Sequence, residues 1–489
     1  MKRFNFLAFA VASTLACFTY PAVGLSAEHD ANWSNWRGPN FDGSSTVATP
    51  PVKWSEEDNI RWKVAVSGKG SSSPVIWGDK LFLLSAVPVE GAEPEEAESE
   101  PAPSAENRGP ERPTRDAGER PSGRDAGPGD RPGRRGRSGG PGGRGGFGRR
   151  ESPSTPVEFT VFCLDKTSGK QLWSQIAVTA VPHEAGHNTN TFASSSAVTN
   201  GEILVAFFGS RGIFCYDLDG ELLWQKDLGE QQTRNAFGEG STPALYQDTI
   251  IVPWDHEGES FVAAFHAKTG DELWKVERDE ATSWATPVVT KRNDVTQVIL
   301  NGSTKVRSYD LKTGKLIWEC GGQATNPIAT PIIYNGTAIC MTGYRGYAVY
   351  AISLDAKGDV TDNDDFIAWS RSDVGPYIAS ATLWKDRLYV TKSRDGVIYC
   401  LDANTGETIY GPERVPECST LYSSLVAGGD RIYVSDRDGT TAVLKAGPDY
   451  DVLSVNQLNE GIDASLALLG NQIYLRGSDH LYCIEAASK

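Results

Sequence analysis

The stretch Ala329-Thr330-Pro331-Ile332-Ile333-Tyr334 places a small residue and then a hydroxyl residue directly before an apolar strand. The same order occurs eight times along the 489 residues of the chain, and from the second copy onward the copies are about 44 residues apart. The eight pairs are Ser72-Ser73, Ser195-Ser196, Ser241-Thr242, Ala285-Thr286, Ala329-Thr330, Ala379-Ser380, Ser423-Ser424 and Ala464-Ser465. A repeat of about 40–45 residues with several short strands is typical of a β-propeller blade. The sequence therefore predicts an all-β fold, an eight-bladed β-propeller of four-stranded antiparallel blades.

A second periodic feature is the turn Asp-x-x-(Ser/Thr)-Gly, which is followed four residues after the Gly by an aromatic residue. It is complete at Asp165–Trp173, Asp310–Trp318 and Asp402–Tyr410, and degraded at Asp217–Trp224 and His266–Trp274. In such a hairpin the Asp and hydroxyl side chains bond the turn backbone and the Gly adopts a positive φ. The aromatic residue then begins the outer strand, and we expect it to pack against the neighbouring blade.

The two ends of the repeat region are complementary. Ile60-Arg61-Trp62-Lys63-Val64 has the pattern of an outer strand but no inner strands precede it, whereas Leu481-Tyr482-Cys483-Ile484-Glu485 reads as a third strand after which the chain stops. We therefore predict that the N-terminal strand completes the last blade and closes the ring, which removes a free sheet edge.

The N-terminus has the features of a secretory signal. Lys2 and Arg3 precede an apolar run, and small residues permit cleavage after Gly24 or Ala27. We predict a signal peptide at 1–27, an N-terminal extension at 28–50, and a propeller formed by 51–87 and 157–489. No stretch reaches the roughly 20 apolar residues of a transmembrane helix. The expected location is periplasmic or secreted, without a lipid anchor.

Residues 88–156 differ from the rest of the chain, because they are rich in Pro, Gly, Ser, Glu and Arg and contain one aromatic residue, Phe147. This composition predicts a disordered insertion within the first blade. Its first half is acidic and its second half is basic, so it is either a contact loop for an acidic surface or an inert insertion. Blade geometry places it on the face that carries the loops leading into the inner strands.

The net charge indicates which partners are unfavourable, and the cysteine positions indicate whether disulfides form. The net charge of −16 argues against nucleic acid as the main partner. Cys163, Cys215, Cys400 and Cys483 occupy the same place in their repeats. Blades stack about 10 Å apart, beyond the ~7 Å reach of a disulfide, so these residues are expected to be buried thiols. We expect a monomer.

Two motifs resemble metal sites. His183-Glu184-Ala185-Gly186-His187 matches the zinc-protease pattern, but that chemistry needs a helix, whereas Pro182 and Gly186 predict a polar loop at the funnel mouth; a weaker metal site remains the alternative. The acidic run 355–365 lacks the order of an EF-hand loop and is predicted to be an outer loop. No catalytic or metal-binding residue is assigned.

A binding site is predicted where the inner strands converge on the axis. The hydroxyl column itself is expected to be structural, because crowding there requires small side chains. The residue before each pair varies instead, which is typical of a recognition surface: Ser71, Ser194, Gly240, Trp284, Ile328, Ile378, Tyr422 and Asp463. Further candidates lie just upstream: Lys69, His187, Asn188, Arg234, Asn235, Asn326 and Tyr377. A mouth of aromatic, amide and charged groups suits a peptide, a sugar or a planar ligand.

These repeats resemble the quinoprotein-type, or PQQ-like, propeller repeats. The family pattern of a strand followed by Leu-Asp-x-x-Thr-Gly-Lys-x-x-Trp is similar to Tyr309-Asp310-Leu311-Lys312-Thr313-Gly314-Lys315-Leu316-Ile317-Trp318. Trp36-Arg37-Gly38-Pro39 and Gly70-Ser71-Ser72-Ser73-Pro74 also resemble exported bacterial members. The resemblance covers nearly the whole chain outside the insertion and implies a fold that hosts several functions.

The resemblance implies two kinds of function. The BamB-like branch implies a non-catalytic scaffold that binds a protein of the cell envelope or a small ligand at the funnel, with no cofactor. The quinoprotein dehydrogenases imply oxidation of alcohols or sugars with PQQ and calcium; their alcohol-oxidising members typically have a vicinal disulfide, whereas this chain has no adjacent cysteines. A carbohydrate-binding propeller is the third hypothesis. The scaffold is the preferred expectation.

Overall fold

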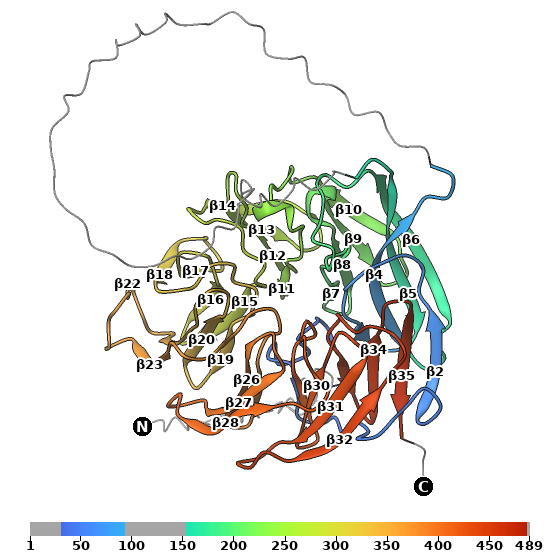
Figure 1. The fold of residues 1–489 in the computed structure, drawn as a ribbon. Coiled ribbons are helices and arrows are strands. Elements are labelled where there is room, and N and C mark those ends of the chain that lie inside the picture. The colour runs from blue at the N-terminus through green and yellow to red at the C-terminus, as the bar shows by residue number, and fades with distance from the viewer. Residues whose placement is uncertain (1–30, 93–152, 487–489) are drawn as a thin grey trace, which may run out of the picture.

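The computed structural model describes residues 31–92 and 153–486. Their strands form eight separate sheets around one axis (Figure 1), and the predicted eight-bladed, all-β propeller is confirmed. The only helices in these two segments are single 3-10 turns at Gly209–Arg211 and Arg234–Ala236. The predicted signal peptide and most of the predicted insertion lie outside the described residues.

Each blade contains four strands that pair antiparallel with their neighbours. Blades 1 to 4 are formed by β3 (Val75–Trp77), β4 (Lys80–Pro88), β5 (Val157–Asp165) and β6 (Gln171–Ala180); β7 (Val198–Thr199), β8 (Ile203–Phe207), β9 (Ile213–Asp217) and β10 (Leu222–Lys226); β11 (Ala244–Tyr246), β12 (Thr249–Trp254), β13 (Phe261–His266) and β14 (Glu272–Glu277); and β15 (Val288–Arg292), β16 (Val295–Leu300), β17 (Val306–Asp310) and β18 (Leu316–Cys320).

The second half of the ring repeats this order. Blades 5 to 8 are formed by β19 (Ile332–Tyr334), β20 (Thr337–Thr342), β21 (Ala348–Ser353) and β23 (Ile367–Arg371); β25 (Thr382–Trp384), β26 (Arg387–Ser393), β27 (Val397–Asp402) and β28 (Thr408–Arg414); β29 (Val426–Gly428), β30 (Arg431–Ser435), β31 (Thr440–Lys445) and β32 (Val452–Gln457); and β33 (Ala467–Leu469), β34 (Gln472–Arg476), β35 (His480–Glu485) and β2 (Ile60–Ala65). Short strands β1 (Ser44–Ser45), β22 (Gly358–Asp359) and β24 (Gly375–Pro376) add parallel pairs to blades 7, 4 and 6.

The second and third strands of each blade form the core. In β12, Ile250, Ile251 and Val252 are all fully buried, because both faces of the sheet are covered by neighbouring blades. Outer strands instead alternate between exposed and partly buried residues, as in β6. The hydrophobic clusters therefore lie between blades; one of them joins Val205 of blade 2 to Ala263 of blade 3.

Hydroxyl side chains link the inner ends of adjacent blades. The backbone N–H of Ser73 donates to the hydroxyl of Ser196 at 2.9 Å, and the N–H of Ser196 donates to that of Thr242 at 3.1 Å. The same bond runs from Thr330 to Ser380, Ser424, Ser465 and back to Ser73 at 2.9–3.1 Å. We call these residues the hydroxyl belt. The hydroxyl column therefore has the structural role that the sequence predicts: its side chains form hydrogen bonds between adjacent blades.

Tryptophans link the outer parts of the blades, as the turn motif predicts. Trp274 Nε1 donates to Leu311 O at 2.8 Å in the next blade. Its ring lies against Gly314, whose φ is +69°, and a Cβ at this glycine would come within 2.7 Å of the ring. Trp62, Trp173, Trp224 and Trp369 pack in the same way on Gly169, Gly220, Gly270 and Gly406.

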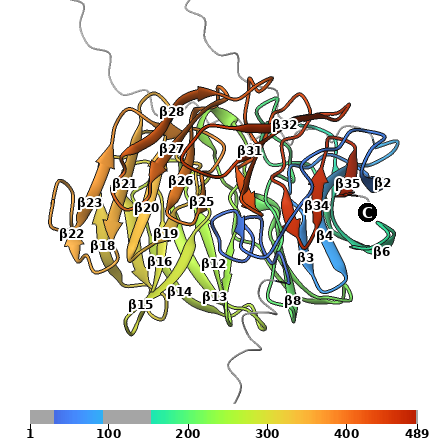
Figure 2. The ribbon, with the colours of Figure 1, turned by 90° about the horizontal axis from the view of Figure 1, so that it is seen from below.

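The ring closes through the two chain ends. β2 pairs antiparallel with β35 in blade 8, and Trp62 lies opposite Cys483, so the predicted closure is confirmed. Strands β2 and β35 therefore lie side by side in the blade 8 sheet, although they come from opposite ends of the described chain (Figures 1 and 2).

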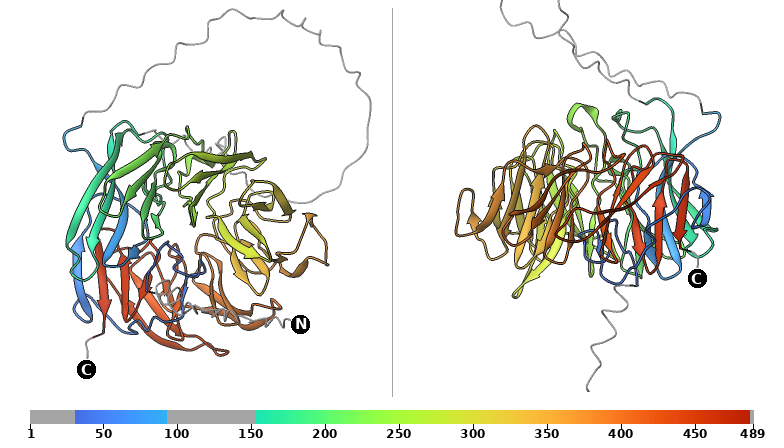
Figure 3. Two further views of the ribbon diagram at one scale, coloured as in Figure 1. Left: turned by 180° about the vertical axis from the view of Figure 1, so that it is seen from behind. Right: turned by 60° about the horizontal axis from the view of Figure 1, so that its bottom comes forward.

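The segment 31–50 runs across the inner side of the ring, on the face that carries the turns between first and second strands, which we call the lower face (Figure 3). It starts at blade 1, where Trp33 and Ile76 exchange backbone hydrogen bonds. The Arg37 guanidinium donates to Ala381 O of blade 6 and Leu425 O of blade 7, and Thr49 N donates to Gly470 O of blade 8. The predicted N-terminal extension is therefore an integral strap under the axis, which we call the strap.

Candidate functional site

A cavity of about 620 Å3 lies at the centre of the ring. It opens on the upper face, which carries the loops entering the inner strands and also the two ends of the insertion, where Pro88 pairs with Val157. Its lower wall is formed by belt residues and by Trp36 of the strap, and its upper wall by loop residues such as Phe237 and Tyr344. Trp36 and the belt thus lie on the strap side of the cavity, which we call the floor, and the loop residues lie on the opposite side, which we call the mouth.

All eight residues that precede the hydroxyl pairs line this cavity. They divide it into two halves. The side chains from blades 1 to 3 are small (Ser71, Ser194, Gly240), whereas blades 4 to 7 contribute Trp284, Ile328, Ile378 and Tyr422, and blade 8 contributes Asp463. The sequence positions that vary thus give the cavity a small polar side and a bulky apolar side.

Trp36 forms the floor of the cavity. Its Nε1 donates to Thr286 Oγ1 at 3.1 Å. In the described chain no belt bond joins Thr242 to Thr286, so at this point Trp36 is the donor to the Thr286 hydroxyl. The neighbouring Arg37 is 1% exposed, and this burial lowers the pKa of its guanidinium to about 10. Three backbone carbonyls bind that guanidinium, so the strap is fixed firmly beneath the cavity.

The ten residues selected from the sequence separate into two groups. Those that line the cavity are His187, Trp284, Tyr377, Tyr422 and Asp463. Those that do not are Lys69, Asn188, Arg234, Asn235 and Asn326.

The five residues outside the cavity lining have other contacts or face solvent. The Lys69 side chain is 65% exposed and pairs with Asp479 at 2.6 Å. Asn188 is exposed on a loop, and Asn235 is exposed on the 3-10 turn Arg234–Ala236. Arg234 Nη1 donates to Asn326 Oδ1 at 3.3 Å, and Asn326 is 2% exposed. Loop geometry, which sequence position does not reveal, turns these side chains away from the axis.

Hydrogen bonds between loops hold the mouth in shape. Thr189 Oγ1 donates to the Tyr422 hydroxyl at 3.2 Å, joining the loop before blade 2 to the loop before blade 7. His187 Nδ1 lies 2.7 Å from Thr189 Oγ1. Tyr344 and Tyr377 stack with ring centroids 4.7 Å apart. The rim is thus preorganised rather than loose.

The charged groups of the cavity are largely compensated. Arg437 binds Asp463 through two bonds of 2.6 and 3.0 Å and lies 4.3 Å over the Tyr422 ring. Burial raises the pKa of Glu239 to about 7, although the backbone N–H and hydroxyl of Ser210 donate to its carboxylate. Arg394 and Asp395 are adjacent at the exposed rim. The cavity presents no uncompensated cluster of one sign.

The zinc-protease-like motif forms a loop, as predicted. Glu184 accepts hydrogen bonds from the backbone N–H and hydroxyl of Thr233, and His183 Nδ1 lies 3.0 Å from Glu230 Oε2. His187 instead turns toward the cavity, where its ring meets Phe237 edge-on at 5.4 Å. His183, Glu184 and His187 therefore contact three different partners and do not converge on one point.

The described lining of the cavity contains carboxylates but no cysteine. Within 31–92 and 153–486, no group of three or more His, Cys, Asp or Glu side chains is arranged to hold a metal ion. The seven described cysteines are buried free thiols, and none lines the cavity. The carboxylates that do line it are bound by Arg437 or Ser210 or lie at the rim.

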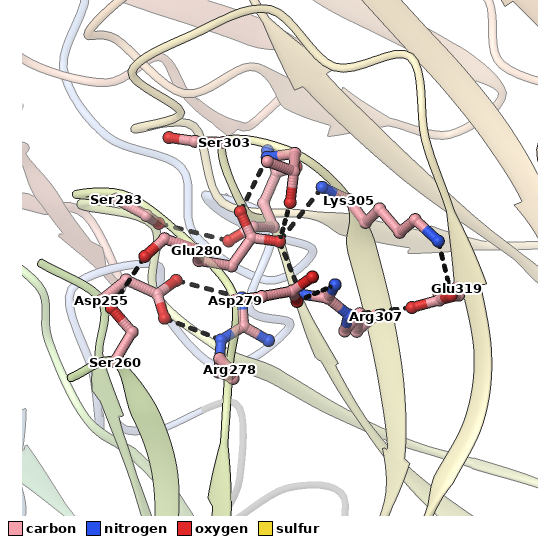
Figure 4. A network of polar contacts seen from close by, with 12 residues as sticks. Asp255, Ser260, Arg278, Asp279, Glu280, Ser283, Ser303, Lys305, Arg307 and Glu319 are labelled. Carbon is pink, nitrogen blue, oxygen red and sulfur yellow. Dashed lines mark hydrogen bonds and ion pairs between the residues drawn. The ribbon is translucent and has the colours of Figure 1, made fainter. Parts of the chain in front are cut away.

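A second polar cluster joins blades 3 and 4 (Figure 4). Arg278 forms an ion pair with Asp255 through bonds of 2.7 and 3.0 Å, and both side chains are at most 1% exposed. Arg307 of β17 binds Glu280 at 2.6 Å and Glu319 at 3.0 Å. Because every carboxylate in this cluster is paired and the cluster lies where the belt is interrupted, its role is to fasten the two blades together.

Several cavity residues are not among the candidates that the sequence indicates for the site. They are Trp36, Thr189, Asn190, Phe237, Glu239, Tyr344, Arg394 and Asp395. Most belong to loops of irregular length, where the repeat period gives no position. Trp36 lies in a motif that was recognised, but its place under the axis depends on the path of the strap.

The described residues contain no helix that is long and apolar enough to cross a membrane. Residues 157–411 match the family described as "Outer membrane protein assembly factor BamB". The chain is 23% identical over 292 residues to methanol dehydrogenase (cytochrome c) subunit 1 of Methylobacterium organophilum, which covers 53% of this chain and 45% of that protein. It is 24% identical over 253 residues to BamB of Shewanella oneidensis. This match covers 50% of this chain and 58% of that protein. The chain thus spans about half the length of these relatives.

Among solved structures, a europium-containing methanol dehydrogenase superposes with a TM-score of 0.58. The superposition covers 94% of this chain and 99% of that chain at 10% sequence identity. A likeness at this identity establishes a common fold and leaves the activity open.

Proposed function

The chain belongs to the family of outer membrane protein assembly factor BamB, and from this premise we propose that it is a non-catalytic binding propeller of the cell envelope. Its binding site is the central cavity, which receives a ligand or a segment of a partner protein through the mouth on the upper face. The cell-envelope location and the binding function are both part of this proposal.

One observation carries this proposal: the eight variable positions of the repeat converge on one cavity that has binding groups but no catalytic constellation. Aromatic rings, hydroxyls and an amide line it, which is the mixture found in recognition pockets. Its volume of about 620 Å3 lies within the range of about 300–1,000 Å3 that is typical of ligand sites. Two of its three carboxylates, those of Asp463 and Glu239, already accept hydrogen bonds from Arg437 and Ser210, whereas a catalytic acid or base must be able to exchange a proton with the substrate.

A quinone-dependent oxidoreductase is the second candidate, because the methanol dehydrogenase relatives share the fold. A loaded enzyme of this kind would use the quinone to accept electrons from an alcohol. The cavity of this chain supplies neither a cluster of metal ligands in the described residues nor free cations for the carboxylates of PQQ beyond Arg394 at the rim. We therefore derive no reaction step from it.

The two candidates are separated by two measurements on the same purified protein. Incubation with PQQ and calcium, followed by desalting, absorbance and a dye-linked alcohol oxidation assay, is expected to give neither bound quinone nor turnover. A photocrosslinker at Tyr377, on the mouth, is expected to give discrete adducts in envelope extracts that disappear when Gly240→Leu fills the cavity. A crosslinker at Leu316, exposed on an outer strand, is the matched control. Retained quinone with turnover would overturn the proposal.

A further inference from the structure

The belt leaves a set of hydrogen-bond donors under the cavity. The hydroxyl oxygens of Ser73, Ser196, Thr242, Ser424 and Ser465 each accept one backbone N–H and also line the cavity. A hydroxyl group has one proton to donate and two lone pairs. Within the described chain none of these five protons has a protein acceptor, so a ligand rich in oxygen acceptors complements this ring of donors.

The opposite half of the cavity is a rigid apolar wall. Trp284 is fixed because its Nε1 donates to Gly238 O at 2.8 Å and its backbone N–H donates to Pro327 O at 2.9 Å. Ile328, Ile378 and the indole of Trp36 continue this surface toward the floor. A preorganised wall of this kind binds the flat apolar face of a ring at little entropic cost.

The compensated charges select against a strongly charged ligand. Asp463 is paired with Arg437, and burial raises the pKa of Glu239 to about 7, which favours its neutral form at acidic pH. Apart from Arg394 and Asp395 at the exposed rim, the described lining offers a charged ligand no free counterion, so transfer of such a ligand into the site would incur desolvation without a matching partner. A neutral ligand incurs no such cost.

We propose, building on the function proposed above, that the cavity is a saccharide site that binds a neutral sugar of one or two rings. The C–H face of the sugar lies against Trp284 and the wall beside it, and its oxygens accept protons from the belt hydroxyls. Trp36 limits how deeply the sugar enters, and the Tyr344–Tyr377 pair flanks the mouth.

The test titrates the full purified chain with neutral mono- and disaccharides of the gluco, galacto, manno and N-acetylglucosamine series. Binding is measured by isothermal calorimetry and by the change in unfolding temperature. Glucuronate, and PQQ with calcium, are titrated in the same way as charged ligands for comparison. We expect saturable binding and a higher unfolding temperature with at least one neutral sugar. Glucuronate is expected to bind at least tenfold more weakly than the matching neutral sugar.

Three variants test the location of the site. Gly240 does not have a positive φ, and a Cβ there would lie 3.4 Å from Trp284 Cδ1 and 3.8 Å from Ser194 Cβ, so Gly240→Leu fills the cavity without backbone strain. It is expected to abolish sugar binding while the unfolding temperature stays close to that of the parent. Trp284→Ala should weaken binding at least tenfold, and Lys69→Ala, outside the cavity, should leave it unchanged.

Each other result overturns the saccharide proposal. These results are no saturable binding by any sugar of the panel, equal binding by Gly240→Leu, or tighter binding of the charged ligands. If the sugars fail while the Tyr377 crosslinks are still lost in Gly240→Leu, the saccharide assignment is wrong and the funnel-binding function stands. If the crosslinks are also unaffected, both proposals are wrong.

Discussion

The backbone N–H of Ser465 donates to Ser73 Oγ at 2.9 Å, so the first residue pair of the repeat binds the last one across 392 positions of sequence. This bond joins blade 8 to blade 1 at the axis, whereas the pairing of β2 with β35 completes blade 8 at its outer edge. The ring is therefore closed by one contact near the axis and by a second contact at its outer edge.

Replacement of a belt hydroxyl should destabilise the ring. In Ser73→Ala the buried N–H of Ser465 loses its acceptor, and an unsatisfied buried donor costs about 1–3 kcal/mol. Urea unfolding should show a loss of this size. Ser71→Ala, which removes a hydroxyl of the cavity but none of the belt, is the control, and an equal loss in both variants would contradict the interpretation.

Removal of the floor should weaken both stability and the sugar site. Trp36→Ala deletes a large, partly buried ring, for which we expect a loss of about 2–4 kcal/mol in the free energy of unfolding. Trp36→Phe keeps an aromatic floor and loses only the bond to Thr286, for which about 1 kcal/mol is expected. Unfolding curves of the two variants, together with sugar titrations, check this order; a reversed order would show that Trp36 does not act as the floor.

A substitution at a turn glycine should be costly although the site is on the outside of the ring. Gly314→Ala places a Cβ within 2.7 Å of the Trp274 ring at a φ of +69°, so both the backbone and the packing resist it. We expect a loss of about 1–3 kcal/mol. Gly447→Ala, where no atom lies within 4 Å of the added carbon, should be neutral in the same thermal unfolding assay.

Breaking the buried ion pair between Asp255 and Arg278 should have the largest effect on stability. Asp255→Asn leaves the guanidinium buried without its counterion, and such changes cost about 3–5 kcal/mol. In the double variant Asp255→Asn with Arg278→Met the remaining charge is removed, so part of the loss should be recovered. A double-mutant cycle of unfolding free energies measures this coupling, and simple additivity would argue against the pair.

Stability should also depend on pH through Glu239. Burial raises the pKa of this carboxyl to about 7 in the folded chain, against about 4.3 in an unfolded one. The folded state thus binds more protons between these values, so this contribution is complete below about pH 4.3 and is lost as the pH rises through about 7. Glu184 acts in the same direction as burial, and Arg211 opposes it.

Glu239→Gln should remove this part of the pH dependence. Unfolding free energies measured from pH 4.5 to pH 8 are expected to fall less steeply in the variant than in the parent chain. Glu221→Gln, on an exposed turn, serves as the control and should follow the parent. A parallel fall in the Glu239→Gln chain would contradict the assignment.

Much of the architecture was accessible from the sequence because the repeat imposes it. The hydroxyl pairs mark each inner strand, and an aromatic residue marks every outer strand except that of blade 7, where Leu453 takes its place, so blade number and closure at Trp62 follow from counting. The positions before the pairs were also located correctly on the axis, because a residue adjacent to a converging strand has nowhere else to point.

The rest of the site depends on loops that have no period. Lys69 and Asn235 lie close in sequence to cavity residues, yet one pairs with Asp479 and the other faces solvent. Glu239 lines the cavity because the loop before blade 3 is bonded to the loop before blade 2, where Asn190 Nδ2 donates to Glu239 O at 3.1 Å. Such contacts between loops follow from the folded structure and not from local sequence.

Only residues 51–59 separate the strap from β2, so the floor of the cavity and the closing strand are made by one continuous segment of chain. β2 finds its partner more than four hundred residues later, and contacts this distant in sequence form slowly. β2 therefore cannot pair until β35 has been synthesised. Asp463 and Ser465 of the loop that enters blade 8 also line the cavity, so we expect a chain truncated before β33 to lose part of the cavity wall together with the blade.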